Sequence, residues 1–252
     1  MKASIASLLF IAPEAVSAFT PSVSKNVKTS LSGGKDDLQT LAVASNPVLK
    51  FYDPLNVADM DFYDTGSDAT IGFLRHAEIK HGRVAMAAFV GYCVQSNFKF
   101  PWAMSLSGES FPSTDLSPEA QWDAIPANAK WQIFTVIAAL EIWDELGGAK
   151  LPHYMNGRKP GQYPPFDVFR ENVHWVPDLF DPAGLSKKAS EEKKSKGLVA
   201  EINNGRLAMI GIFGFISADA VEGSVPLLKD IAIPYDGNAM APLSAHFSMF
   251  SN

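Results

Sequence analysis

A duplicated segment constrains this chain more than any other feature. Residues 78–91 and 201–214 agree at seven of fourteen aligned positions, and the second copy is offset from the first by 123 residues. Each copy opens with Glu-Ile-x-x-Gly-Arg and continues into apolar residues. Isolated acids and arginines are costly in an apolar helix, so both copies need partners for these charges. The spacing is too long for a solenoid repeat and indicates one unit built from a duplicated half.

Composition and motifs exclude several classes of function. The 252 residues carry a net charge of -6 without a basic stripe, which argues against nucleic acid as a partner. A metal-dependent membrane enzyme is one alternative, but the first copy lacks the second histidine of a zinc helix motif, and no phosphate-binding loop or nucleophile triad is visible. We therefore expect no enzymatic activity. A helical protein that uses the charges only as ion pairs is a further alternative.

Three apolar segments, at about residues 70–95, 127–146 and 198–218, predict an all-α protein. Their longest uncharged stretches are 84–98, 131–140 and 207–218, each shorter than the roughly 20 residues of a simple membrane span. Once each Glu and Arg is neutralised, however, each segment is long enough to cross a hydrocarbon layer of roughly 30 Å. We expect a membrane protein with three transmembrane helices.

The repeat also predicts how two of these helices meet. Within one helix the Glu and the Arg are five residues apart, about 140° around the axis, so they do not face each other. If the first and third helices cross as a pseudo-two-fold pair, Glu78 meets Arg206 and Glu201 meets Arg83. Gly82 and its counterparts supply the small surface that close helix approach requires.

Loop charge predicts the orientation. Residues 148–197 contain nine Lys or Arg, whereas 96–129 contains only Lys99. The positive-inside tendency places the amino terminus and the 148–197 loop on one side, and the 96–129 loop and the carboxyl terminus on the other. The run 186–197 is mixed in charge and is interpreted as a solvated loop.

Candidate ligands lie beside the repeated acids. His81 and Asn204 each follow the Glu of their copy by three residues, on the same side of the helix. Imidazole and an amide oxygen both suit a five-coordinate magnesium held in a porphyrin-like ring, although either residue could instead make an interhelical hydrogen bond. One oxygen of each repeated Glu can bind an arginine while the other reaches a metal. Glu141 ends the second apolar run and is either another ligand or a solvated helix end.

The amino terminus has the features of a targeting leader. Lys2, the apolar stretch 5–12 and the small residues at 16–18 predict a signal peptide that ends at about residue 18. Residues 20–32 are rich in Ser, Thr and Lys without an acid, as in a transit peptide. Residues 1–32 are interpreted as a leader and 33–252 as a single domain. The sequence around Phe19 resembles the bipartite leader of plastids derived from a red alga; an ordinary secreted protein is the alternative.

The two copies, Glu-x-x-His-Gly-Arg and Glu-x-x-Asn-Gly-Arg, resemble the first and third membrane helices of the light-harvesting chlorophyll-binding family. The resemblance extends over about residues 50–230, and the Asp-Pro turns at 53–54 and 181–182 are similar to those of the family. It implies three membrane helices with carotenoids beside the crossing. It also implies five ligands to chlorophyll magnesium, with Gln132 as a weaker sixth: Glu78, His81, Glu141, Glu201 and Asn204. Where many members carry a further glutamine ligand, this chain has Ala218.

The leader and the segments 152–155 and 223–228 resemble the chlorophyll a/c branch of that family. This implies an antenna protein of the plastid thylakoid membrane, crossing it several times and binding chlorophyll a, chlorophyll c and a carotenoid of the fucoxanthin, peridinin or diadinoxanthin type. A photosystem core, other antenna subunits and thylakoid lipids are the implied partners. The alternative within the family is a photoprotective member, in which acids of the 96–129 loop sense pH: Glu109, Asp115, Glu119 and Asp123.

Overall fold

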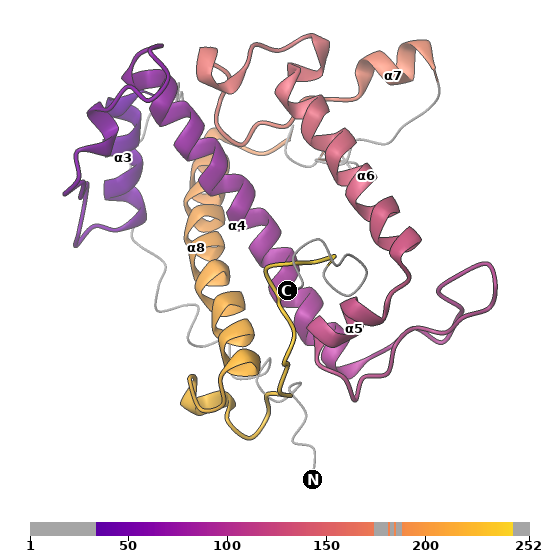
Figure 1. Cartoon of the computed structure of the whole chain (residues 1–252). Helices are drawn as coiled ribbons and strands as arrows, with labels where there is room; N and C mark the ends of the chain where they lie inside the picture. The colour runs from indigo at the N-terminus through magenta and orange to yellow at the C-terminus, as the bar shows by residue number, and fades with distance from the viewer. Residues whose placement is uncertain (1–33, 174–180, 182–183, 185–187, 244–252) are drawn as a thin grey trace. The chain divides into compact units, whose positions relative to one another are not determined.

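The computed structural model describes residues 34–173, 181, 184 and 188–243, so the predicted leader lies outside the described residues. Within these ranges the chain is helical, and the only pairing of extended segments is an isolated antiparallel bridge between Ala103 and Ser110. The all-α prediction is confirmed for this part of the chain. The α-helices, shown in Figure 1, are α3 (Lys35–Ser45), α4 (Ser67–Asn97), α5 (Pro118–Ala124), α6 (Ala127–Glu145), α7 (Asp167–Asn172) and α8 (Glu191–Ala220).

Helices α4, α6 and α8 contain the three predicted apolar segments. Asp61 accepts hydrogen bonds from the backbone N–H groups of Thr65 and Gly66 and so shapes the turn that precedes α4. Helix α6 starts directly after Pro126 and gives way to Gly147 and Gly148, both with positive φ, which glycine adopts without strain. Among the helices described here, none combines the length and the apolarity of a membrane span.

Helix α8 begins earlier than predicted. Ser190 Oγ accepts a hydrogen bond of 3.3 Å from the Lys193 N–H, and two acids occupy the first turn, where they interact favourably with the helix dipole. The interpretation of 186–197 as a loop is therefore wrong from residue 191 onward. Acids and lysines at helical spacing support an exposed helix, here through the pairs Glu191–Lys194 and Glu192–Lys196, each at 2.8 Å.

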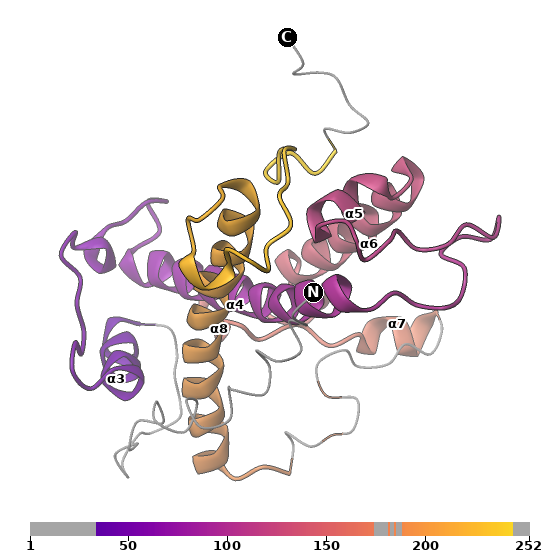
Figure 2. The same cartoon turned by 90° about the horizontal axis from the view of Figure 1, so that it is seen from below.

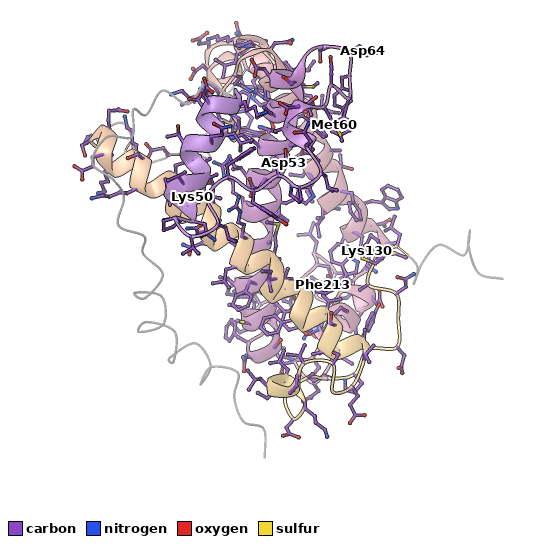
Figure 3. The ribbon with its side chains drawn as sticks, turned by 90° about the vertical axis from the view of Figure 1, so that its left-hand side faces the viewer. Lys50, Asp53, Met60, Asp64, Lys130 and Phe213 are labelled. Carbon is purple, nitrogen blue, oxygen red and sulfur yellow. The ribbon has the colours of Figure 1, made fainter. Side chains whose placement is uncertain are left out.

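The described residues form two compact units: 34–83 with 138–206, called the first unit, and 84–137 with 207–243, called the second unit. In the first unit α3 packs on α4 and α8 through the buried side chains of Leu41, Ile79, Val199 and Ile202 (Figure 1). Ile79 and Ile202 occupy the same position in the two copies of the repeat. The segment that joins α3 to α4 carries the labelled residues Lys50, Asp53, Met60 and Asp64 of Figure 3.

Aromatic side chains hold the second unit together. Phe215 of α8 stacks on Phe89 and Tyr92 of α4, with ring centroids 5.0 Å and 4.7 Å apart. Helix α5 lies beside the start of α6 (Figure 2), where the rings of Trp122 and Phe134 meet edge to face at 6.0 Å. Large apolar side chains of this unit, among them Val90, Val136 and Phe213, are exposed.

Two glycines bring the backbones of α4 and α8 into contact within the first unit. A Cβ atom on Gly205 would lie 2.9 Å from the Cα of Gly82, and a Cβ on Gly82 would lie 3.1 Å from the Cα of Gly205. Real Cβ atoms essentially never show the 2.9 Å distance, and 3.1 Å is tighter than nine in ten real contacts, so a side chain at Gly205, and to a lesser degree one at Gly82, would push the helices apart. The predicted role of Gly82 in close approach agrees with this geometry.

We expect Gly205→Ala to lower the free energy of unfolding by on the order of 1–3 kcal/mol, the usual cost of overpacking. This loss should appear even though alanine is the better helix former by about 1 kcal/mol. Gly214→Ala is the matched control, because a Cβ on Gly214 meets no atom within 4 Å. Denaturant unfolding in detergent measures both variants; equal stabilities would contradict the contact.

Candidate functional site

Two reciprocal ion pairs form the centre of the first unit. Arg206 Nε donates to Glu78 Oε1 at 2.7 Å, and Arg83 Nε donates to Glu201 Oε1 at 2.6 Å. The same pairs of atoms are joined in both, as a pseudo-two-fold relation between α4 and α8 requires. Within the part of the chain that the structure describes, Oε2 of each glutamate has no hydrogen-bond partner. Each carboxylate therefore offers one oxygen to a ligand.

His81 has the tautomer that a metal ligand needs. Its ring is exposed, and Nδ1 lies 2.7 Å from the carbonyl oxygen of Ala77 one turn earlier. A carbonyl oxygen only accepts, so Nδ1 carries a proton, and in the neutral ring Nε2 is then the nitrogen whose lone pair can bind a metal. Asn204, at the equivalent place on α8, is also exposed, and its amide forms no hydrogen bond with the described residues.

Of Glu141 and Glu145, near the end of α6, Glu141 is the one available to a ligand. Both oxygens of Glu145 are occupied, since His153 Nε2 lies 2.8 Å from Oε2 and the Tyr154 hydroxyl donates to Oε1 at 3.0 Å. Glu141 is half exposed and pairs through Oε2 with Lys80. Its Oε1 has no hydrogen-bond partner among the residues described. These contacts favour Glu141 over Glu145 as a ligand.

The remaining ligand-type side chains differ in their availability. Gln132 is exposed on α6, whereas Ala218 is buried and offers no side-chain ligand. His76 is buried with both ring nitrogens engaged: Nδ1 accepts from the Gly161 N–H at 3.1 Å, and Nε2 donates to Asp144 at 2.9 Å. His153 is likewise engaged through both nitrogens. His174 and His246 lie outside the described residues.

A cavity of about 480 Å³ opens beside one ion pair, and Glu78 and Arg206 form part of its wall. The buried Arg75 also lines it, with Nε and Nη1 lacking a hydrogen-bond partner within the described ranges. An unpaired buried donor is costly, so a ligand with a carbonyl or carboxylate acceptor would be stabilised here. The rest of the wall is mainly apolar and comes from α3, the segment after it and the start of α4, including Leu38, Ala42, Ile71 and Leu74. This wall fits a large amphiphilic ligand.

The sequence reasoning missed a buried charge cluster around Asp144. This carboxylate lies 2.9 Å from each of three side-chain nitrogens, Lys80 Nζ, His76 Nε2 and Arg158 Nη2. A signal was present in the sequence, because Glu141 and Asp144 are three residues apart and share one face of α6. That spacing does not predict which cations pair with these acids, namely Lys80 on α4 and Arg158 in the 147–161 segment.

The second unit contains a pair of buried acids. Both carboxylate oxygens of Glu119, on α5, are buried beside Asp219 of α8, and the Tyr92 hydroxyl donates to Asp219 Oδ2. Burial, with the neighbouring Asp219 carboxylate, raises the pKa of Glu119 to about 7. Glu119 therefore takes up a proton close to neutral pH.

A raised carboxyl pKa stabilises the folded state at low pH. For Glu119 this contribution is complete below the ordinary value of 4.5 and is lost as the pH rises through about 7. We expect the midpoint temperature of thermal unfolding to decrease as the pH is raised from 5 to 8. In Glu119→Gln this decrease should be smaller. Glu109→Gln, at an exposed acid of the same loop, is the control. An unchanged pH dependence in Glu119→Gln would contradict the burial of this carboxyl.

Ion-paired helices with an unengaged glutamate oxygen on each, an exposed imidazole and a mainly apolar cavity fit the class of protein that holds ring-shaped magnesium pigments. The sequence comparison agrees, because residues 37–220 match the chlorophyll A-B binding protein family. The chain belongs to this family, and the resemblance expected from the repeat is confirmed.

Its relatives include proteins of the chlorophyll a/c branch. The chloroplastic fucoxanthin-chlorophyll a-c binding protein of Trieres chinensis is 30% identical over 241 residues, covering 92% of this chain and all of the relative. Fucoxanthin-chlorophyll a-c binding protein F of Phaeodactylum tricornutum is 32% identical over 176 residues, 69% of this chain and 76% of the relative. Protein E of Macrocystis pyrifera is 26% identical over 193 residues, 75% of this chain and 78% of the relative. The family binds pigment, and its members are not enzymes.

Proposed function

We propose that this chain is a light-harvesting antenna protein that binds chlorophyll a, chlorophyll c and fucoxanthin and passes excitation energy to a photosystem. The observation that carries the proposal is the pair of reciprocal ion pairs, each of which leaves one glutamate oxygen available within the family's chlorophyll-binding motif. The names of the relatives support fucoxanthin rather than peridinin as the carotenoid. Pigment chromatography of the native complex tests the proposal, and a colourless folded protein would overturn it.

In this proposal α4, α6 and α8 cross the thylakoid membrane. Their 31, 19 and 30 residues correspond to about 46, 28 and 45 Å at roughly 1.5 Å per residue, so α4 and α8 exceed a hydrocarbon layer of roughly 30 Å and α6 nearly matches it. The repeated charges inside α4 and α8 are neutralised as the pairs Glu78–Arg206 and Glu201–Arg83, which lowers the cost of placing them in lipid. The first and third of them cross as the predicted pseudo-two-fold pair. Residues 1–32 act as the plastid-targeting leader, and 33–252 form one pigment-binding domain.

The chlorophyll magnesium ligands in this proposal are Glu78, His81, Glu141, Glu201 and Asn204, with Gln132 as a weaker sixth. The pigments supply light absorption and energy transfer when bound, and the chain supplies ligands, spacing and local polarity. An arginine beside each repeated glutamate compensates its charge and holds one of its oxygens in place. The hydrogen bond from His81 Nδ1 to Ala77 sets the plane of the imidazole. A photosystem core, other antenna subunits and thylakoid lipids are the partners.

We expect His81→Leu to remove one chlorophyll per chain and to leave the other sites filled, because leucine offers no lone pair to magnesium. His81→Asn should retain that chlorophyll, since asparagine stands at the equivalent position of α8. His153→Leu is the matched control, because both of its ring nitrogens are bonded within the protein. Pigment-to-protein ratios after reconstitution measure the three variants; an unchanged ratio in His81→Leu would reject its role.

Removing one arginine tests the membrane setting of the ion pairs. In water a pair as exposed as Arg206–Glu78, with side chains 49% and 31% exposed, contributes only about 0–1 kcal/mol. In lipid an uncompensated carboxylate costs on the order of 3–5 kcal/mol, so Arg206→Leu should lower the free energy of unfolding by that larger amount. Glu78→Gln in the same chain should recover most of the loss. A loss within the smaller range would count against this helix pair lying in the membrane.

A photoprotective role is the second candidate, and the buried pair Glu119–Asp219 favours it. These acids lie on the side of the membrane assigned to the 96–129 loop and the carboxyl terminus, and the raised pKa of Glu119 places its protonation near pH 7. Protonation there would allow acidification to change how pigments are held. The chlorophyll fluorescence lifetime of the pigmented protein should then shorten between pH 8 and pH 5, and Glu119→Gln should lose this response. A lifetime independent of pH would reject the photoprotective role and leave the antenna role as the remaining candidate.

A further inference from the structure

The two copies of the repeat differ at one position that decides what each copy contacts. Lys80 of α4 pairs with Glu141 of α6 and lies 2.9 Å from Asp144 on the same helix. Its counterpart on α8, Asn203, instead donates from Nδ2 to the backbone oxygen of Ser45, at the end of α3, at 3.2 Å. The lysine thus connects α4 to α6, whereas the asparagine connects α8 to α3.

The positive charge of Lys80 compensates Glu141, because Asp144 has another counter-charge. Asp144 already has a full counter-charge in Arg158, whose Nη2 is 2.9 Å from Oδ1, and both side chains are 1% exposed. His76 contributes only a neutral N–H, because its Nδ1 accepts from the Gly161 N–H. The four charged groups of the cluster therefore sum to zero only if Lys80 balances Glu141. Without the lysine, the net negative charge falls on the more exposed of the two acids, Glu141.

We propose that Lys80 is a positioning residue for a third ligand site: it compensates Glu141, as Arg206 compensates Glu78 and Arg83 compensates Glu201. Each of the three glutamates has one oxygen bonded to a cation from a neighbouring helix and one oxygen without a hydrogen-bond partner in the described residues. Lys80 holds Oε2 of Glu141 and leaves Oε1 to face chlorophyll magnesium. The inference rests on the proposed function and extends it to a residue outside the set of expected ligands.

A lysine suits this site for a physical reason. Its ammonium is a compact charge with three donors, so it bonds Glu141 and Asp144 together, whereas the arginines of the repeat each meet a single carboxylate. The side chain of Lys80 is 23% exposed against 52% for Glu141, so the cation lies behind the acid and leaves its outer oxygen accessible. The same contact joins α4 to α6 in the first unit.

The test compares the wild type, Lys80→Met, Glu141→Gln and the double variant after reconstitution with chlorophylls and carotenoid, with Lys80→Arg, Glu141→Leu and Lys35→Met measured beside them. Lys80→Met should weaken chlorophyll binding at one site at least about tenfold. Removing the cation of a buried ion pair usually destabilises the protein by more than the free energy that corresponds to a tenfold change in affinity. Glu141→Gln keeps an oxygen ligand without a charge, so the double variant should regain the pigment. Lys80→Arg should also retain it. Lys35→Met is the matched control, because it removes a lysine–aspartate pair, Lys35–Asp59, that involves no proposed ligand.

A second readout does not depend on pigment. The double-mutant cycle of Lys80→Met and Glu141→Gln, followed by denaturant unfolding of the chain in detergent, should give a favourable coupling between the two residues. Pigment loss equal in Lys80→Met and Lys35→Met, or a double variant as depleted as Lys80→Met, would overturn the inference; the latter would assign the effect to Asp144. Full pigment in Glu141→Leu would also overturn it while leaving the antenna function intact. A wild-type chain without chlorophyll would reject the antenna function itself.

Discussion

The reciprocal pairing of Glu78 with Arg206 and of Glu201 with Arg83 is the constraint on which the first unit depends. It is possible only because Gly82 and Gly205 let the two backbones touch. Each glycine directly precedes the arginine of its copy, so the contact carries each arginine onto the facing helix, where its Nε meets a glutamate oxygen. Charge compensation therefore depends on the close approach of the two helices. A side chain at either glycine would weaken both.

Each ion pair divides the two oxygens of its glutamate between two roles: one is bonded to the arginine, and the other is available to a ligand. A carboxylate engaged by an arginine through one oxygen is both neutralised and fixed in direction, which are the two properties a magnesium ligand needs. In the proposed function the exposed His81 and Asn204 add neutral ligands that need no counter-charge. Pigment sites with and without a formal charge on the ligand would then lie close together on one pair of helices. We infer that the two kinds of site tune their pigments differently.

Divergence between the copies is concentrated where they meet different surroundings. Ile79 and Ile202 are identical, and both are buried in the core with α3. Lys80 and Asn203 differ, and they contact α6 and α3 respectively. A duplicated helix pair is symmetric about its own contact, but Lys80 meets Glu141 and Asp144 of α6, whereas Asn203 meets the backbone carbonyl of Ser45 at the end of α3. The residues that point outward from the axis therefore had to change.

By itself the sequence determined the helical segments, the reciprocal ion pairs and the register of the candidate ligands, because helical periodicity and a repeat in register specify which residues share a face. It missed the early start of α8, where capping and exposed ion pairs outweigh the loop-like composition. Only the tertiary structure decided which cation serves Glu141, that Arg75 lines a cavity unpaired, and that Glu119 is buried beside Asp219. Each of these depends on which third element packs against a given face. Periodicity within one helix contains no information about that choice, since burial and pairing arise from residues distant in the chain.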